Sequence, residues 1–236
     1  MSIDEVRELA ALLRRTGPVL LDFDGPVCGI FAGGRNAAIA SHLREVLADH
    51  GVGVGEKLAD DPDPLNVLRY TAHAAPRLLS AVEEVLIDEE ITALSVATPT
   101  PHAHEAIRAC HGAGRAVVIV SNNSPAAIRA YLEHHQLADD VRAVVGRAHA
   151  RPDLMKPHPD PVHRALSILE TAPDACVLVG DSDTDVQVAL ATGVHPIGYA
   201  KRLERRSQLA EAGAEVVIDS METFAAAVRT ASPLLS

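Results

Sequence analysis

The chain has 236 residues, of which 47% are hydrophobic and 22% are charged, and its formal net charge is -11. This composition excludes a disordered chain, and the length allows one large domain or a core domain with a small insertion. Because nucleic-acid phosphates repel an acidic surface and no basic tract offsets the charge, the sequence also argues against a nucleic-acid partner.

The cysteines and the lack of long apolar runs bear on where the protein works. Cys28, Cys110 and Cys176 are dispersed, without the paired spacing of a disulfide framework or a zinc site. The first residues lack a basic stretch of the kind that precedes a signal sequence, and no apolar run approaches the length of a membrane span. We expect a soluble cytoplasmic protein with no membrane partner.

The first expected elements are a helix and a buried strand. Apolar residues recur at helical spacing ahead of Gly17, at positions Val6, Leu9, Leu12 and Leu13. The apolar run at 18–21 predicts a strand, which ends in two carboxylates, Asp22 and Asp24. Gly25 then allows the backbone to turn away. We therefore expect both carboxylates to project from the strand end into a cleft.

The segment that follows is helical in pattern. Residues 35–50, 64–74 and 76–94 carry apolar residues at helical spacing, and no strand is expected between Asp24 and about Ala97. An insert of about 65 residues is far longer than an ordinary connection between two strands. We predict a helical cap domain at 29–94, inserted into a core domain formed by residues 1–28 and 95–236.

Beyond residue 100 the pattern alternates regularly between helices and strands. The expected helices are 102–113, 125–136, 161–170, 184–192 and 201–212, and the expected strands are 116–120, 141–145, 176–179, 194–197 and 215–218. The strands read as continuous apolar runs, which is typical of a parallel sheet covered on both faces. We predict a doubly wound α/β core, whose ligands bind at the carboxyl ends of the strands.

Polar residues follow three of these strands. Ser121 and Asn122 precede a helix, where free backbone N–H groups suit a phosphate, although helix capping alone also explains them. Lys156, one of only three lysines, can neutralise a carboxylate and a phosphoryl oxygen together. Asp181 and Asp185 offer the oxygen ligands that Mg²⁺ prefers, and Asp183 is a competitor for the role of Asp185.

Four short motifs together resemble the haloacid dehalogenase (HAD) superfamily. Asp22-Phe-Asp24-Gly25 resembles motif I, Ser121-Asn122 motif II, Lys156-Pro157 motif III and Gly180-Asp181-Ser-Asp-Thr-Asp185 motif IV. Each fragment follows an expected strand, and together they cover nearly the whole chain. The resemblance implies a HAD-like core, and a helical insert directly after motif I is similar to the C1 caps of phosphoglycolate phosphatase-like and phosphoglucomutase-like members.

The resemblance also implies a chemistry, the Mg²⁺-dependent hydrolysis of a small phosphorylated metabolite. Asp22 would attack phosphorus and Asp24 would serve as the acid and base. Mg²⁺ would be held by Asp22, the Asp24 carbonyl and Asp181, with Asp185 as a second ligand or an outer-shell anchor.

By the same resemblance, the remaining motif residues would serve the phosphoryl group. Ser121 would bind a phosphoryl oxygen, Asn122 would assist through its backbone, and Lys156 would disperse the charge on the transferring group.

Two other functions remain open at this stage. A phosphomutase of the same superfamily differs mainly in whether a sugar or water receives the phosphoryl group, and a non-catalytic relative would keep the fold as a binding module. Pro26 stands where the motif usually has Thr, so the contribution of that hydroxyl is absent. The sequence does not name the substrate, and it leaves the oligomeric state open.

Overall fold

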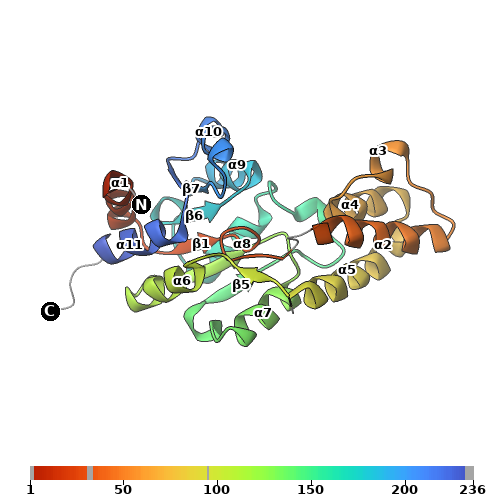
Figure 1. Cartoon of the computed structure of the whole chain (residues 1–236), viewed down its shortest axis with the longest axis horizontal. Helices are drawn as coiled ribbons and strands as arrows, with labels where there is room; N and C mark the ends of the chain where they lie inside the picture. The colour runs from red at the N-terminus through yellow and green to blue at the C-terminus, as the bar shows by residue number, and fades with distance from the viewer. Residues whose placement is uncertain (1–2, 31–33, 95, 232–236) are drawn as a thin grey trace.

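A six-stranded parallel sheet forms the centre of the computed structural model, which describes residues 3–30, 34–94 and 96–231. The strand order is β5-β4-β1-β6-β7-β8, with β1 (Val19–Leu21), β4 (Val117–Val120), β5 (Ala143–Val145), β6 (Val177–Gly180), β7 (His195–Tyr199) and β8 (Val216–Ile218). Figure 1 labels β1, β5, β6 and β7 of this sheet. Strand β1 pairs in parallel with both β4 and β6. The predicted doubly wound α/β core is confirmed.

Side chains of the central strands alternate between two helical layers. Val19 and Leu21 pack into one apolar core, whereas Leu20 belongs to the core on the opposite face. The first layer contains α1 (Ile3–Arg15), α6 (Ala103–Gly112), α7 (Pro125–His134) and α11 (Met221–Ala231). The second contains α8 (Asp160–Leu169), α9 (Asp183–Thr192) and α10 (Leu203–Glu211). Both faces of the sheet are therefore covered, as the apolar strands require.

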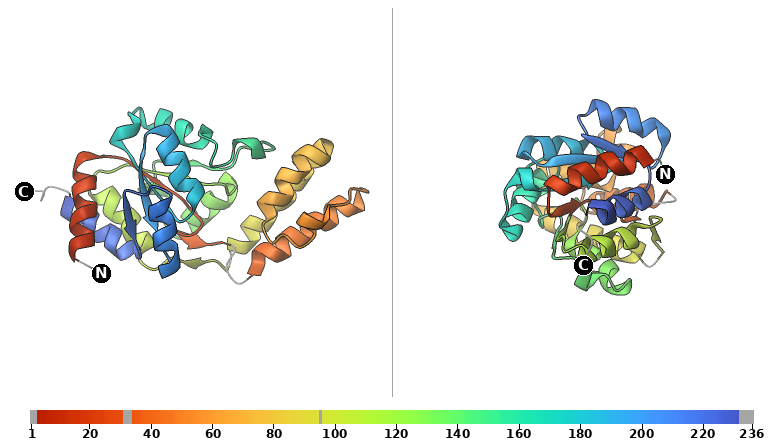
Figure 2. Two further views of the ribbon diagram at one scale, coloured as in Figure 1. Left: turned by 90° about the horizontal axis from the view of Figure 1, so that it is seen from above. Right: turned by 90° about the vertical axis from the view of Figure 1, so that its left-hand side faces the viewer.

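The expected helices lie between β1 and β4, in a segment that we call the helical insertion (Arg35–Leu94). It consists of α2 (Arg35–Asp49), α3 (Glu56–Ala59), α4 (Pro64–Ala74), a short 3-10 turn (Pro76–Leu78) and α5 (Leu79–Leu94). Ile39, Leu43, Leu68 and Leu86 are buried in a separate apolar core. Figure 2 shows α2 and α5 projecting from the sheet. The insertion therefore folds around its own core, while α5 also packs against α7.

A short ribbon that the sequence did not predict joins the insertion to the sheet domain. β2 (Cys28–Gly29) pairs antiparallel with β3 (Thr98–Pro99). The expectation of no strand between Asp24 and Ala97 is thus wrong at β2. Two residues are too few to show an alternating pattern, and the partner of Cys28 is Pro99, which lies 71 positions away in the sequence (99 − 28). Residues 1–2, 31–33, 95 and 232–236 of the predicted domains lie outside the described residues.

Most other elements lie within two residues of their predicted ranges, but the four-residue α3 was missed, and so was α11. Met221, Phe224, Ala225 and Val228 are buried on one face of this helix at helical spacing. They complete the core between α1 and α6. The helical periodicity was therefore present in the sequence. It was hard to recognise because the neighbouring alanines are compatible with a buried or an exposed face. No described helix is long and apolar enough to cross a membrane.

We predict that Phe224→Ala lowers the free energy of unfolding by about 3–5 kcal/mol, because it leaves a cavity where a fully buried ring stood. Urea unfolding followed by circular dichroism measures this change. Thr230→Ala, on the exposed face of the same helix, is the matched control and should change stability by less than about 0.5 kcal/mol. Equal effects of the two substitutions would show that α11 is not part of the core.

Candidate active site

The predicted site residues meet at the carboxyl edge of the sheet. Asp22 follows β1, Ser121 follows β4 and Asp181 follows β6, so the pairing of β1 with both neighbours brings these three ends together. The cavity beside them has a volume of about 410 Å³. Its walls also include residues of the helical insertion, namely Asn36, Asp63, Pro64, Leu65 and Arg69. The site therefore lies between the sheet and the insertion.

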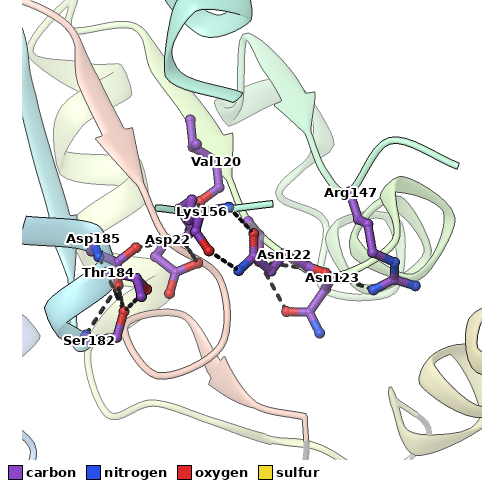
Figure 3. Close-up of polar contacts among 10 residues, drawn as sticks. Asp22, Val120, Asn122, Asn123, Arg147, Lys156, Ser182, Thr184 and Asp185 are labelled. Carbon is purple, nitrogen blue, oxygen red and sulfur yellow. Dashed lines mark hydrogen bonds and ion pairs between the residues drawn. The ribbon is translucent and has the colours of Figure 1, made fainter. Parts of the chain in front are cut away.

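The ammonium of Lys156 is the centre of the site (Figure 3). Its Nζ atom donates to Asp22 Oδ1 at 2.8 Å, to Asp185 Oδ1 at 2.5 Å and to the Val120 carbonyl at 3.0 Å. The lysine is only 2% exposed. A charge this deep requires paired charges and full hydrogen bonding, and here three acceptors satisfy its three N–H groups.

Asn122 holds the backbone of Lys156 in place. Its Oδ1 atom accepts from the Lys156 N–H at 2.8 Å, and its Nδ2 atom donates to the Lys156 carbonyl at 3.2 Å. The loop after β4 and the segment carrying the lysine are thus joined by a two-point amide contact. Sequence reasoning expected Asn122 to act through its backbone, and its side chain has this additional role.

Asp181 lies against the turn that follows Asp24. Gly25 has φ of 113°, and a Cβ atom placed on it would lie 2.2 Å from Asp181 Oδ2. Only glycine permits both this backbone conformation and the close approach of the carboxylate. Ligand oxygens of Asp22, Asp181 and Asp185 consequently lie within 4.8 Å of one another.

Asp185 is anchored at the start of α9. Its Oδ2 atom accepts from the Ser182 N–H at 3.1 Å and from the Ser182 hydroxyl at 2.5 Å, while Ser182 Oγ accepts from the Asp185 N–H. This reciprocal capping box leaves Oδ1 for Lys156. Asp183, the competing carboxylate, is exposed and pairs with Arg205. Of the two carboxylates, Asp185 alone reaches the lysine.

The loop after β4 carries the candidate phosphate ligands. Ser121 is buried, and its hydroxyl donates to Asn123 Oδ1 at 3.0 Å and accepts from the Asn123 N–H at 3.2 Å. The cap of α7 is Ser124, whose hydroxyl accepts from the Ala127 N–H. Since Ser124 does the capping, helix capping no longer accounts for Ser121 and Asn122.

Asp24 also lines the cavity, but it does not bind Lys156. Its Oδ1 atom accepts from the Ile30 N–H at 3.1 Å, and it lines the same cavity as Asp22. The turn after it is fixed from a distance, because the Thr100 hydroxyl donates to the Gly25 carbonyl at 2.5 Å. Thr100 was not singled out in the sequence, since nothing in its neighbourhood indicates a contact with residue 25.

Burial and mutual repulsion set the protonation of these carboxyls. Burial, followed by the charge of Asp185, raises the pKa of Asp22 to about 7 despite the opposing effect of Lys156. Burial and the charge of Asp22 raise the pKa of Asp181 to about 8. Burial raises the pKa of Asp24 to about 6. For Lys156, burial alone would lower the pKa, but Asp185 and Asp22 together raise it, so the ammonium stays charged.

The donor set fits a divalent cation with a preference for oxygen. Three carboxylates within 4.8 Å of one another repel unless a proton or a cation lies between them. Both oxygens of Asp185 are already engaged by Lys156 and Ser182. Asp22 and Asp181 are therefore the carboxylates best able to hold an ion, with Asp185 supporting them through the lysine.

Comparison with known proteins identifies the family. Residues 19–193 match the family described as haloacid dehalogenase-like hydrolase. The chain belongs to this family. The resemblance drawn from the four motifs is therefore confirmed, and the site described above lies within the matched part of this HAD-like hydrolase.

The curated relatives are phosphatases by name. The phosphoglycolate phosphatase of Rhodospirillum rubrum is 30% identical over 185 residues, which cover 77% of this chain and 68% of that protein. That of Salmonella paratyphi A is 28% identical over 120 residues, covering 51% of this chain and 47% of the relative. The match thus spans about half the length of the Salmonella relative.

Solved structures share the fold at low sequence identity. A predicted phosphatase from Clostridium acetobutylicum has a TM-score of 0.67 and 20% identity, covering 91% of this chain and 99% of that one. CbbY from Rhodobacter sphaeroides, solved with phosphate, has a TM-score of 0.65 and 18% identity, covering 87% and 95%. These neighbours share the overall fold of this HAD-like hydrolase.

Glu83, Glu90 and Arg147 form a buried ionic cluster beside the site that sequence reasoning missed. A signal existed in α5, where Glu83 and Glu90 share a face with the buried Leu86. Acidic residues on an apolar helix face indicate a buried partner. The sequence does not indicate that Arg147 is this partner.

We predict that Mg²⁺ raises the melting temperature more at about pH 8.5 than at about pH 6. The folded-state pKa values of Asp181 and Asp22 lie above the ordinary aspartate value, so the folded, metal-free protein binds more protons than the unfolded chain. Its stability therefore falls as pH rises through about 7 to 8, and a cation that competes with those protons gains most at high pH. Differential scanning fluorimetry with and without MgCl₂ measures the difference.

Asp181→Asn provides the test of this prediction, and Asp183→Asn is its matched control. The first should raise the metal-free melting temperature at high pH, because it removes a repelled charge, and should suppress the response to Mg²⁺. The second alters an exposed carboxylate of the same segment and should keep the response. A Mg²⁺ response of equal size at both pH values, or one that survives Asp181→Asn, would contradict the assignment.

Proposed function

We propose that the protein hydrolyses a small phosphate monoester in a Mg²⁺-dependent reaction that passes through an aspartyl-phosphate on Asp22. The observation that carries this proposal is the convergence of Asp22, Asp181 and Lys156 in one cavity. The loop after β4, residues Ser121–Ser124, which we call the phosphate-type loop, contributes to the same cavity. The curated relatives named phosphoglycolate phosphatase support a phosphoryl-ester substrate. A covalent intermediate divides a very slow hydrolysis into two easier steps.

In the first step Asp22 attacks phosphorus as the bond to the leaving oxygen breaks. Its Oδ1 atom is held by Lys156, which leaves Oδ2 free to be the nucleophile. Asp24 donates a proton to the leaving oxygen, and its pKa of about 6 suits a group that must be protonated and deprotonated in turn near neutral pH. In the second step Asp24 takes a proton from water, which attacks the phosphoryl group and releases Asp22.

The charge on the transferring group is balanced by residues from three strand ends. Lys156 supplies a fixed ammonium, and Ser121 and Asn122 present hydroxyl and backbone groups to the phosphoryl oxygens. When bound, Mg²⁺ held by Asp22, Asp181 and the Asp24 carbonyl would neutralise phosphoryl charge and align the ester. Asp185 acts as an outer anchor, because its oxygens already bind Lys156 and Ser182.

The helical insertion is proposed to be the cap domain, at residues 29–94, over a core domain of residues 1–28 and 95–236. Its contribution to the cavity wall supports a role in choosing the substrate. A further CbbY structure is described as a complex with xylulose 1,5-bisphosphate, which fits a small phosphorylated substrate here. Three buried free thiols support a cytoplasmic setting.

Asp22→Asn should reduce the release of phosphate from p-nitrophenyl phosphate by about four orders of magnitude, because the amide is not a nucleophile. Asp183→Asn, which alters an exposed acid, should retain activity. Release of phosphate by Asp22→Asn at a rate near that of the wild type would refute the mechanism. With a sugar phosphate as substrate, formation of an isomeric sugar phosphate without free phosphate would instead indicate a phosphomutase.

Arg69 is the cation that the insertion contributes to the cavity wall, and we expect it to contact the part of the substrate beyond the phosphate. Its Nη1 atom donates to Asn66 Oδ1 at 2.9 Å, which fixes the guanidinium. Arg69→Ala should raise KM for the best substrate of a phosphorylated-metabolite panel about tenfold, with little effect on p-nitrophenyl phosphate. Arg77→Ala, an exposed arginine of the same insertion, is the control. Unchanged KM in Arg69→Ala would remove this residue from the site.

A further inference from the structure

A buried cluster of three charges joins α5 of the helical insertion to the sheet domain. Arg147 donates from Nε to Glu83 Oε1 at 2.7 Å and from Nη1 to Glu90 Oε1 at 2.9 Å. Its Nη2 atom also reaches Glu90 Oε2 at 3.2 Å. The exposed fractions of Arg147, Glu83 and Glu90 are 3%, 1% and 0%. Groups this buried are costly unless each contact is well made, so the cluster has one favourable geometry.

The same cluster contacts the loop that carries the candidate phosphate ligands. Glu90 Oε1 accepts from Asn123 Nδ2 at 3.3 Å, and Glu90 Oε2 accepts from the Ser124 N–H at 2.9 Å. Arg147 Nη1 donates to the Asn122 carbonyl at 2.7 Å, and the Arg147 N–H donates to the Asn123 carbonyl at 2.9 Å. Figure 3 shows the Arg147 side chain beside this loop. Two carbonyls and two donors of the loop are thus fixed by residues outside it.

These contacts determine where the Ser121 hydroxyl points. A trans peptide directs its C=O and N–H in opposite directions, so the Asn122 carbonyl that faces Arg147 turns the Asn123 N–H the other way. That N–H donates to Ser121 Oγ, which itself donates to Asn123 Oδ1. Asn123 is in turn held by Glu90 through its Nδ2 atom. The orientation of Ser121 therefore depends on a helix of the insertion.

We propose that Glu90 and Arg147 are positioning residues that hold the Ser121–Ser124 loop in its phosphate-binding conformation. The proposal rests on the proposed function, because it concerns how the same site is built. Docking of α5 and assembly of the phosphate site are then one event. A chain in which α5 is displaced from the sheet domain loses the anchor of Ser121.

The two glutamates offer a matched pair of variants, because the same substitution has opposite consequences at each. Both oxygens of Glu90 accept two hydrogen bonds each, so in Glu90→Gln the amide nitrogen faces two donors whichever way the side chain is turned. Glu83 Oε1 accepts from Arg147, whereas Glu83 Oε2 is buried without a partner. Glu83→Gln can place its nitrogen at the Oε2 position and lose no hydrogen bond.

The experiment compares the two variants with the wild type using p-nitrophenyl phosphate as substrate and inorganic phosphate as competitive inhibitor. We expect Glu90→Gln to lower kcat/KM and to raise the inhibition constant of phosphate, each by about tenfold or more. Glu83→Gln should keep both constants within about twofold of the wild type. Melting temperatures report the structural effect of each substitution separately from the kinetic effect.

The outcome separates positioning from a merely structural role. If Glu90→Gln melts earlier but keeps the wild-type inhibition constant for phosphate, the glutamate only stabilises the fold and the proposal fails. Should Glu90→Gln not fold, Arg147→Lys replaces it, since lysine keeps the charge but supplies one nitrogen where three are used. Wild-type phosphate affinity in Arg147→Lys overturns the proposal, and weakened affinity supports it.

Failure of the proposed function has a different signature. A wild-type protein that hydrolyses no phosphate ester would refute the phosphatase assignment alone. Calorimetric titration of inorganic phosphate into the wild type, Glu90→Gln and Glu83→Gln still measures the affinity of the Ser121–Ser124 loop for phosphate. Weaker binding by Glu90→Gln alone supports the positioning role, and equal binding by all three proteins, or none, overturns it.

Discussion

The pairing of one buried ammonium with two carboxylates is the constraint on which the site depends. Lys156 connects Asp22 to Asp185, and its carbonyl and N–H are held by Asn122. Without this charge two buried carboxylates would repel each other, and their pKa values would rise further. A nucleophile needs to be ionised. By opposing the effect of burial on the pKa of Asp22, the lysine favours the ionised carboxylate that the proposed mechanism requires.

Sheet topology explains why residues so far apart in the chain can meet around that lysine. A parallel sheet directs all carboxyl ends to one edge, and β1 lies between β4 and β6. Asp22, the proposed nucleophile, thus has the Ser121–Ser124 loop on one side and Asp181 on the other. Close approach at this edge needs small residues. Cβ atoms added to Gly25 and Gly180 would lie within 2.2 Å and 2.3 Å of Asp181 and Asp185.

The sequence predicted the parts of the site that follow strands, and it missed those whose partners are distant. Asp22 and Asp181 could be found because an apolar run that ends in a charge is a local signal, and Lys156 because lysine is rare in this chain and Lys156-Pro157 resembles a HAD motif. Glu90 and Arg147 are separated by 57 positions, and their contact depends on how α5 packs on the sheet domain. The sequence around each residue does not indicate which residue it will contact. The same reason accounts for Thr100, which meets Gly25 across the whole insertion.

The ionic cluster formed by Glu83 and Glu90 of α5 with Arg147 differs physically from the apolar contacts elsewhere between the layers. Apolar packing tolerates small shifts along a helix, because its attraction has little direction. Glu90 meets Arg147, Asn123 and Ser124 in a single register, since four donors must reach two oxygens. Replacing such a cluster by apolar residues often stabilises a protein, so stability alone gives no reason for it. Its directional contacts supply what apolar packing would not, a defined position of the phosphate-type loop relative to the helical insertion.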